Sequence, residues 1–337
     1  MDRASHLSVV VDLSPNHWYL SSTRTQQNAR PLSLKSFLSQ LLVFLNSHIA
    51  CKDENTLAVF GALPGRSVML HSSTNESSGN PFEMADADTY RPFKILDAEV
   101  MQTIARHVET LGPSDIKKPV ELVGALSKSL CYINRITTAS STQSNEQTAA
   151  LDPRILILSV SPDQSSSYIP IMNSIFAAQK LKVTIDICKV YGSESVFLQQ
   201  AAHLTGGSYL HLERADALLQ YLTMSFLPPP SIRQLLSVPT QDKIDFRAAC
   251  FCHKRIVDIG FVCSVCLSIF CQPVPVCSTC RTKFPIKTLQ RLNAARPTVA
   301  TPATTPTVQT ALSLPSSNSI KGTNVNGSQS TVQNGSR

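Results

Sequence analysis

The chain has 337 residues, of which 42% are apolar, and its 30 basic and 23 acidic residues give a net charge of +7. This length and apolar content favour one large domain with a sizeable core plus a small module, and the charge is mild. No run of about 18 apolar residues occurs, so we expect no transmembrane helix. The opening residues MDRASHLSVVVDLS lack a basic segment followed by an apolar run, so we also expect no secretory signal and a reducing environment.

Strand and helix patterns alternate over the first two thirds of the chain. Continuous β-branched and apolar runs indicate buried strands, and apolar residues three and four positions apart indicate helices. In chain order these patterns predict a strand at 7–14, a helix at 34–45, strands at 57–63 and 67–70, helices at 96–111 and 120–133, a strand at 154–160, a helix at 169–181, a strand at 183–190, a helix at 196–204, a strand at 208–212 and a helix at 215–226.

This alternation predicts an α/β fold, a mostly parallel sheet with helices on both faces. The two short strands joined by Pro64-Gly65 would form one antiparallel edge. Two polar stretches, 71–90 and 137–150, are predicted as a loop and an insertion. Pro228-Pro229-Pro230 ends the last helix, so we place this domain at residues 1–230.

The densest chemical signal follows that domain. Residues 249–280 hold seven of the ten cysteines, together with His253. In a reducing compartment such a local group of thiols indicates metal binding rather than disulfides. We therefore predict a small zinc-finger module, of the ribbon or RING-like kind, at 245–292, with a metal that supplies much of its folding free energy. The remaining cysteines lie singly in apolar surroundings and are predicted as small buried thiols, Cys51, Cys131 and Cys188.

The spacing of the cysteines predicts which of them share an ion. Two Cys-x-x-Cys knuckles lie ten residues apart, and four thiolates favour a tetrahedral Zn²⁺. The main site is therefore predicted from Cys263, Cys266, Cys277 and Cys280. A possible second zinc site comprises Cys250, Cys252, His253 and Cys271. Taken in chain order, alternate groups share an ion, as in a cross-brace. The alternative for the second site is that Cys271 and one of Cys250, Cys252 or His253 are buried or free.

The last 45 residues have a different character. Residues 293–337 are dominated by Thr, Ser, Asn, Pro and Gly, and contain no acidic and no aromatic residue. Such a segment cannot bury enough apolar surface to fold, so it is predicted as a disordered low-complexity tail.

The first strand ends in a motif with a known chemical use. Ligands of parallel sheets gather beyond the carboxyl ends of the strands, and there the sequence reads Asp12-Leu-Ser14-Pro-Asn16. Asp-x-Ser-x-Ser at this place is the metal-ion-dependent adhesion signature, and the order of strands and helices over residues 5–227 resembles that of von Willebrand factor A domains. The resemblance implies a divalent cation, completed by a threonine from a later loop and an aspartate after the fourth strand.

The set of cation ligands in this chain is incomplete. Asn16 stands where the signature has serine, and the later loop offers Ser114 and Asp115 but no threonine. Ser161 and Asp163 stand near the last position. Magnesium prefers a near-ideal octahedron of oxygen ligands. We therefore expect a vestigial cation site made of Asp12, Ser14, Asn16 and Asp163, with Asp12 capping a neighbouring helix or turn instead.

The two halves together resemble a single family. A von Willebrand A-like domain followed by DFRAACFCHKRIVDIGFVCSVCLSIFC and a further Cys-x-x-Cys is similar to the small von Willebrand-type subunit of TFIIH, the Tfb-four family, over residues 5–292. The resemblance implies a nuclear, non-catalytic subunit of the TFIIH core that acts in transcription and nucleotide-excision repair. It also implies a four-cysteine zinc finger, and a partner in the larger von Willebrand-type subunit, which bears zinc and regulates a helicase of the complex.

Three functional classes remain open on the sequence. A scaffold of two protein-binding modules is favoured, because no Gly-x-x-x-x-Gly-Lys-Ser/Thr motif and no local nucleophile motif occurs, so we expect no enzyme activity. A RING-type ubiquitin ligase is the second class. Direct nucleic-acid binding is the third, since basic residues accompany the cysteines, although few aromatic residues interleave with them. These basic residues are Lys254, Arg255, Arg281, Lys283, Lys287, Arg291 and Arg296.

Overall fold

A computed structural model describes residues 4–24, 30–74, 90–143, 151–164, 167–233, 235–236, 250–253, 257 and 259–294. Several predicted features fall partly outside these ranges. They are most of the polar loop at 71–90, the second half of the polar insertion, the part of the predicted zinc-finger module at 245–249, 254–256 and 258 with Lys254 and Arg255, and nearly all of the predicted tail with Arg296.

Six strands form one sheet in the order β3-β2-β1-β4-β5-β6. All neighbouring pairs are parallel except β2 and β3, which form the antiparallel edge that the Pro64-Gly65 turn predicted. Gly65 has a φ of 69°, a left-handed conformation that favours glycine. The strands are β1 (Ser5–Asp12), β2 (Thr56–Leu63), β3 (Arg66–Ser72), β4 (Asp152–Ser159), β5 (Thr184–Lys189) and β6 (Tyr209–His211).

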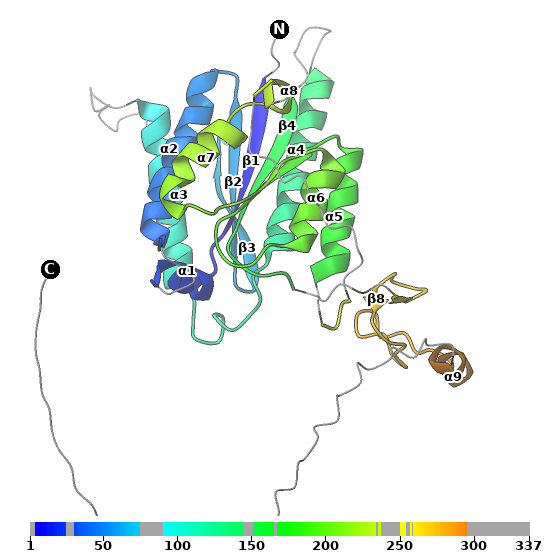
Figure 1. The fold of residues 1–337 in the computed structure, drawn as a ribbon. Helices are drawn as coiled ribbons and strands as arrows, with labels where there is room; N and C mark the ends of the chain where they lie inside the picture. Colours follow the sequence, from blue (N-terminus) through cyan, green and yellow to red (C-terminus); the bar gives the residue numbers. More distant parts are fainter. Residues whose placement is uncertain are drawn as a thin grey trace, which may run out of the picture.

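Helices cover both faces of this sheet (Figure 1). One face carries α1 (Pro15–Ser22), α2 (Leu34–Cys51), α3 (Arg91–Glu109) and α7 (Leu218–Tyr221). The other carries α4 (Leu122–Gln143), α5 (Tyr168–Lys180) and α6 (Val196–Thr205). The predicted α/β fold class, a mostly parallel sheet between two layers of helices, is therefore confirmed.

The burial of the strands explains their sequences. In β1, β2 and β4 every residue after the first is buried, so these strands read as continuous apolar runs rather than as alternating ones. The odd and even positions of β1 feed two separate cores: Val9 and Val11 face α2 and α3, while Val10 faces α4 and α5. Both cores consist of buried apolar side chains, and their burial is the main source of stability of this domain.

Several helices differ from their predicted form, and α3 begins at Arg91, five residues before its predicted start. Helix α1 was not predicted; it begins at Pro15, a favourable first helical residue, and buries only Trp18 and Ser21. Helices α2 and α4 run further than predicted, and α4 extends into the polar insertion as far as Gln143. The predicted helix at 215–226 is instead three short turns, the 3₁₀ turn η2 (Ala215–Ala217), α7 and the π-helical turn η3 (Leu222–Phe226).

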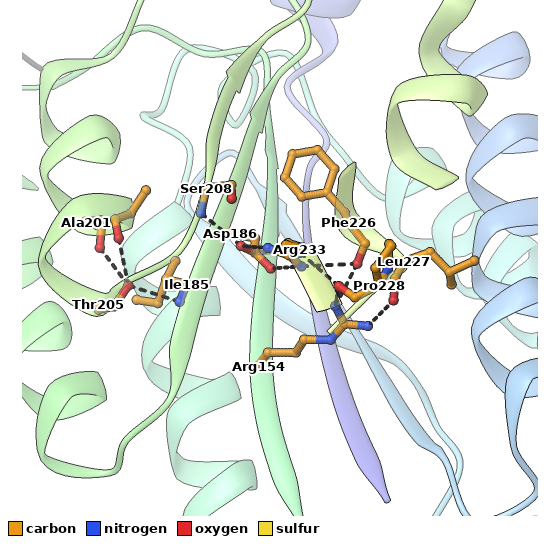
Figure 2. A network of polar contacts seen from close by, with 11 residues as sticks. Arg154, Ile185, Asp186, Ala201, Thr205, Ser208, Phe226, Leu227, Pro228 and Arg233 are labelled. Atoms are coloured by element: carbon orange, nitrogen blue, oxygen red, sulfur yellow. Dashed lines mark hydrogen bonds and ion pairs between the residues drawn. The ribbon is translucent and has the colours of Figure 1, made fainter. Parts of the chain in front are cut away.

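A buried network of charges fixes the chain where the sheet domain ends (Figure 2). Arg154 at the start of β4 donates to the carbonyl oxygens of Phe226 (2.7 Å), Leu227 (2.8 Å) and Pro228 (3.0 Å). These carbonyls follow the last helical turn, where no intrahelical donor is left for them. The Arg154 side chain thereby anchors the segment that leads out of the domain, and it is almost completely buried.

A second arginine completes this network. Arg233 in the short helix α8 (Pro230–Arg233) forms a bidentate ion pair with Asp186 of β5, at 2.6 and 2.7 Å, and also donates to Pro228 O at 2.8 Å. Asp186 accepts the backbone N–H of Ser208 as well. Burial lowers the pKa of Arg154 to about 10, which keeps its guanidinium charged at neutral pH. Arg233 thus pairs directly with the buried Asp186 carboxylate, which also attracts the Arg154 guanidinium through space. Removal of Asp186 would leave buried positive charge uncompensated.

The cysteine-rich module has little regular structure. It contains two antiparallel strands of two residues, β7 (Phe261–Val262) and β8 (Ile269–Phe270), and the helix α9 (Ile286–Ala294). Phe251 joins the module to the sheet domain, because its ring lies 6.4 Å from that of Phe197 in α6 and 6.5 Å from that of Phe270. Among the helices of the described residues, none has the length and apolarity needed to cross a membrane.

Candidate metal centre

Two matching turns present the four cysteines of the predicted main site. In the first, Leu267 N–H donates to Cys263 O at 2.9 Å, and Leu267 has a φ of 59°. In the second, Arg281 N–H donates to Cys277 O at 2.9 Å, and Arg281 has a φ of 61°. A left-handed non-glycine residue directly after the second cysteine is a strained conformation, and it occurs at the same position of both knuckles.

A hydroxyl group follows each of these left-handed residues. Ser268 Oγ lies 3.0 Å from Cys266 Sγ, and Thr282 Oγ1 lies 3.0 Å from Cys280 Sγ. The hydrogen bond from Thr282 lowers the pKa of the Cys280 thiol to about 6. Hydroxyl donors stabilise thiolates, the form in which cysteine binds metal.

The distances between the sulfurs fit a tetrahedral zinc ion. Cys263 Sγ lies 3.7 Å from Cys280 Sγ, and Cys266 Sγ lies 3.5 Å from Cys277 Sγ. Zinc–sulfur bonds of about 2.3 Å at tetrahedral angles place sulfur atoms about 3.8 Å apart. All four sulfurs lie within 4.8 Å of one another. The residues present therefore fit one zinc ion.

The second predicted group is also assembled. Its four ligand atoms lie within 4.8 Å of one another, although Cys252 and Cys271 are far apart in sequence. Cys252 Sγ lies 3.7 Å from Cys271 Sγ, and His253 Nδ1 lies 3.4 Å from Cys271 Sγ, both near tetrahedral spacing. Cys250 Sγ lies only 2.7 Å from Cys252 Sγ, closer than two ligands of one zinc ion. Three members thus fit an ion as they stand, and Cys250 fits after its sulfur moves away from Cys252.

The three isolated cysteines divide into two kinds. Cys188 in β5 is fully buried, as predicted, and burial raises the pKa of its thiol to about 12. The prediction of burial is wrong for Cys51 and Cys131, which are exposed. Cys51 is the last residue of α2, and Cys131 lies on the solvent side of α4, so apolar neighbours in sequence did not mean apolar neighbours in space.

The degenerate cation residues lie where β1 and β4 end, but each has another partner. Asp12 accepts the backbone N–H groups of Ser14 at 3.1 Å, Val160 at 3.1 Å and Ser161 at 2.8 Å. Ser14 Oγ lies 2.8 Å from His17 Nδ1.

The other two predicted cation residues, Asn16 and Asp163, contact other parts of the chain. Asn16 donates weakly to Ile116 O, at 3.5 Å, in the loop that contains Ser114 and Asp115. Asp163 accepts from the hydroxyl of Ser195 and from Phe197 N–H at 3.2 Å, so it caps the beginning of α6. Asp115 pairs with Lys118 at 2.8 Å. The structure thus brings Asp12 and Ser14 together and directs Asn16, Asp115 and Asp163 to other contacts.

Sequence reasoning missed one residue at this place. Lys189, the last residue of β5, is fully buried, and its ammonium donates to Ser161 O and, at 3.3 Å, to Ser159 Oγ. The signal was a lysine inside the apolar run VTIDICKV, since a charged residue in a buried strand requires a polar partner. Arg154 and Asp186 are also charged residues in buried apolar strands, and sequence reasoning missed their polar partners as well.

Comparison with known proteins gives a uniform result. The family model described as Transcription factor Tfb4 matches residues 4–281, a range that includes both cysteine groups. The general transcription and DNA repair factor IIH subunit tfb4 of Schizosaccharomyces pombe is 38% identical over 292 residues, which cover 86% of this chain and 92% of the relative. The corresponding subunit TFB4 of Arabidopsis thaliana is 34% identical over 287 residues, covering 84% and 90%.

A solved structure agrees with these relatives. The crystal structure of the TFIIH p34 N-terminal domain is similar to this chain with a TM-score of 0.56 and 28% sequence identity. The match covers 66% of this chain and 98% of that one.

Proposed function

This chain belongs to the Tfb4 transcription factor family, and we propose that it is a structural, non-catalytic subunit of TFIIH in transcription initiation by RNA polymerase II and nucleotide-excision repair. The observation that carries the proposal is the extent of the match: relatives named as TFIIH subunits align with at least four fifths of the chain, through both the sheet domain and the cysteine groups. A role in such a complex places the chain in the nucleus.

We propose that the bound metal is zinc. Four thiolates at tetrahedral spacing support one ion at Cys263, Cys266, Cys277 and Cys280, and the interleaved second group supports another at Cys250, Cys252, His253 and Cys271. The two ions would hold together a module whose strands are only two residues long. On this basis we assign residues 1–230 to the von Willebrand A-like domain, 245–292 to the zinc module and 293–337 to the tail.

We also propose that the sheet domain docks the larger von Willebrand-type subunit of the complex. The domain buries apolar cores on both faces of its sheet, and its exposed helical surfaces, apart from the contact of α6 with Phe251, are the candidates for docking. The cation residues Asp12, Ser14, Asn16 and Asp163 are proposed to be vestigial, because each already has a protein partner. Docking would therefore proceed without a bridging cation.

The test is affinity purification of the tagged full chain from nuclear extract, followed by identification of the bound proteins. Recovery of the other TFIIH core subunits is expected, and their absence with a folded chain would contradict the proposal. The same purification with Cys263→Ser separates the two units: retention of the larger von Willebrand-type subunit assigns docking to the sheet domain, and its loss assigns docking to the module. Recovery of a ubiquitin-conjugating enzyme without TFIIH subunits would favour a ligase instead.

A second candidate function is supported by the distribution of charge. The residues after Asp258 contain no acidic residue, so the basic residues there account for the whole net charge of +7: Arg281, Lys283, Lys287, Arg291, Arg296, Lys321 and Arg337. Lys287 and Arg291 lie four residues apart in α9, Lys283 precedes that helix, and all three side chains are exposed. Exposed basic residues grouped in this way suit contact with nucleic-acid phosphates.

Salt dependence tests this second function. Three phosphate contacts by Lys283, Lys287 and Arg291 predict a slope of about −3 for log K against log salt on duplex DNA. Reversal of these three charges to glutamate should abolish binding, whereas the same change at the exposed residues Lys35, Lys94 and Lys180 of the sheet domain should not. Absence of binding by the wild-type chain at physiological salt would remove the second function and leave the first untouched.

A further inference from the structure

The crevice between the carboxyl ends of β1 and β4 is the place where the strand order of the sheet reverses. Ligands of open parallel sheets bind at such switch points, and Asp12 is the residue of β1 that reaches it. The Asp12 carboxylate is fully buried, and its two oxygens accept three backbone N–H groups, those of Ser14, Val160 and Ser161. Both oxygens are therefore occupied in tying the loop after β4 to the loop after β1.

A buried ammonium lies beside this carboxylate. Lys189 ends β5, directly opposite Ser159 in the register of β4 and β5. Its ammonium donates to Ser161 O, while Ser161 N–H donates to Asp12 Oδ2. One residue of the β4 loop thus connects the negative and the positive group, and the lysine holds the loop from the side opposite to Asp12.

The charges of these groups also shift one another's pKa values. Burial lowers the pKa of Lys189 to about 8, and the carboxylates of Asp12 and Asp163 oppose that shift, so the ammonium is charged at neutral pH. His17, whose imidazole lies 2.8 Å from Ser14 Oγ, has its pKa lowered by burial, raised by Asp12 and lowered by Lys189. The crevice therefore already contains one positive charge that faces Asp12, Asp163 and His17.

A divalent cation does not fit this arrangement. Magnesium needs about six oxygen ligands at close to 2.1 Å, whereas the Asp12 oxygens hold backbone N–H groups and the Asp163 oxygens cap α6. A second cation beside the Lys189 ammonium would also meet direct charge repulsion in a buried site.

We propose that the Lys189 ammonium is a built-in replacement for the divalent cation of this fold, which keeps the loops after β1 and β4 in one fixed arrangement without any metal. This inference rests on the proposal that the cation site of Asp12, Ser14, Asn16 and Asp163 is vestigial. It names the Lys189 ammonium as the group that takes the place of the metal. A covalently attached cation cannot dissociate, so any surface formed by these loops is independent of magnesium concentration.

Two variants of the full chain separate charge from space. Lys189→Met keeps the length of the side chain and removes its charge, which leaves Asp12 uncompensated and should lower the Tm by on the order of 10 °C. Lys189→Ala removes the charge and also opens room for an ion. Millimolar MgCl₂, compared with NaCl of equal ionic strength, should raise the Tm of Lys189→Ala by several degrees and leave Lys189→Met and the wild type unchanged. Lys180→Ala, an exposed change on α5, is the control.

Trp18 makes the measurement specific to this domain. It is the only tryptophan of the chain, it is buried, and its indole N–H donates to Asp12 O at 2.8 Å. Its fluorescence therefore reports unfolding at the crevice rather than in the cysteine module. Magnesium is added rather than removed because a chelator would also strip metal from the cysteines.

If Lys189→Ala does not fold, a double-mutant cycle tests whether Lys189 compensates the charge of Asp12. When Lys189 compensates Asp12, the variant Asp12→Asn/Lys189→Met should lose clearly less stability than the two single changes summed. Additive losses, together with no magnesium response of Lys189→Ala, would overturn the role of Lys189 while the site stays vestigial. Stabilisation of the wild type by magnesium, abolished by Asp12→Asn, would overturn both the replacement and the vestigial site.

Discussion

The sheet domain and the cysteine module reach their folded states by different means. In the sheet domain, Phe37 and Phe44 of helix α2 and Phe60 of strand β2 are buried in the cores on the two faces of the sheet. In the module, Val262, Val265 and Leu267 are each more than half exposed, although they flank the knuckle cysteines. Burial of a large apolar side chain stabilises a fold by about 1.5–3 kcal/mol, and the module uses this source at few positions, chiefly Phe251 and Phe270.

The two regions therefore depend on different sources of folding free energy. Ordering one residue costs about 1–2 kcal/mol of backbone entropy, which the few buried side chains of the module do not offset. A structural zinc ion in a small finger contributes about 10–16 kcal/mol at neutral pH. Packing should therefore govern the stability of the sheet domain, and ligand chemistry should govern that of the module.

The largest effect is expected for Cys263→Ser. Loss of one thiolate of the main site should unfold the module and release its zinc, while the Trp18 fluorescence and the Tm of the sheet domain stay unchanged. Zinc content measured by elemental analysis and protease resistance of the segment after residue 250 check this outcome. The matched control is Cys131→Ser, since Cys131 is an exposed thiol on α4. A variant that keeps its zinc and its protease resistance would show that the ligand assignment is wrong.

The next effect belongs to the sheet domain and involves charge rather than packing. Asp186→Ala leaves Arg154 and Arg233 buried without their carboxylate, so the free energy of unfolding should fall by about 3–5 kcal/mol. Denaturant titration followed by Trp18 fluorescence measures this loss. The control is Asp97→Ala. Asp97 lies on α3, and its carboxylate bonds only Asn46 in the described structure, so its loss should lower the free energy of unfolding by about 1 kcal/mol or less. Equal losses for the two variants would argue against the network.

The sequence predicted the packed part of this fold well, for a physical reason. Runs such as those of β1 and β4 are apolar at every position because both faces of a parallel sheet are covered, so burial is visible in the local sequence. The grouping of the knuckle cysteines was predictable as well, because the spacing within a knuckle is local. The helix predicted at 196–204 ends one residue later, at Thr205, and Gly206 follows with a φ of 72°.

What could not be predicted depends on contacts between distant segments. Arg154 bonds carbonyls 72 or more residues away, and Lys189 contacts Ser161 only because β5 lies beside β4. The last of the irregular turns at 215–226 ends at Phe226, whose carbonyl bonds Arg154 rather than a further helical turn. A charged residue in an apolar strand signals that a partner exists, but the topology decides which one.

A smaller effect is expected where the two regions meet. Phe251→Ala removes the ring between Phe197 of the sheet domain and Phe270 of the module, and should cost about 3 kcal/mol, the lower end for a buried phenylalanine. The loss should appear as faster proteolysis of the module with unchanged zinc content, because the ligands remain. Phe176→Ala, a change of a half-exposed ring on α5, is the control. Release of zinc from Phe251→Ala would mean that packing, and not the ligands alone, holds the metal.

The smallest effect concerns acid, and it affects both regions for different reasons. In the sheet domain, burial and the neighbouring His48 lower the pKa of His6 to about 3, while burial and Arg154 lower that of His48 to about 4. Both imidazoles are hydrogen-bonded in the interior, His6 to Thr56 and Ser8, and His48 to Thr56 O. They remain neutral in the folded chain at pH values where the unfolded chain already takes up protons.

The sign of the pH dependence follows from this difference. The unfolded histidines take up protons below a pKa of about 6.5, so the stability that the neutral forms provide is complete above that pH and falls as the pH drops towards 4 and 3. From pH 7 to pH 5.5 the two residues together should cost the sheet domain about 2–3 kcal/mol. Denaturant titrations followed by Trp18 fluorescence measure this, and His6→Gln should remove about half of the slope. In the module the same acid protonates thiolates and releases zinc, so zinc loss without a change in Trp18 stability would assign acid sensitivity to the ligands alone and contradict the role of the buried histidines.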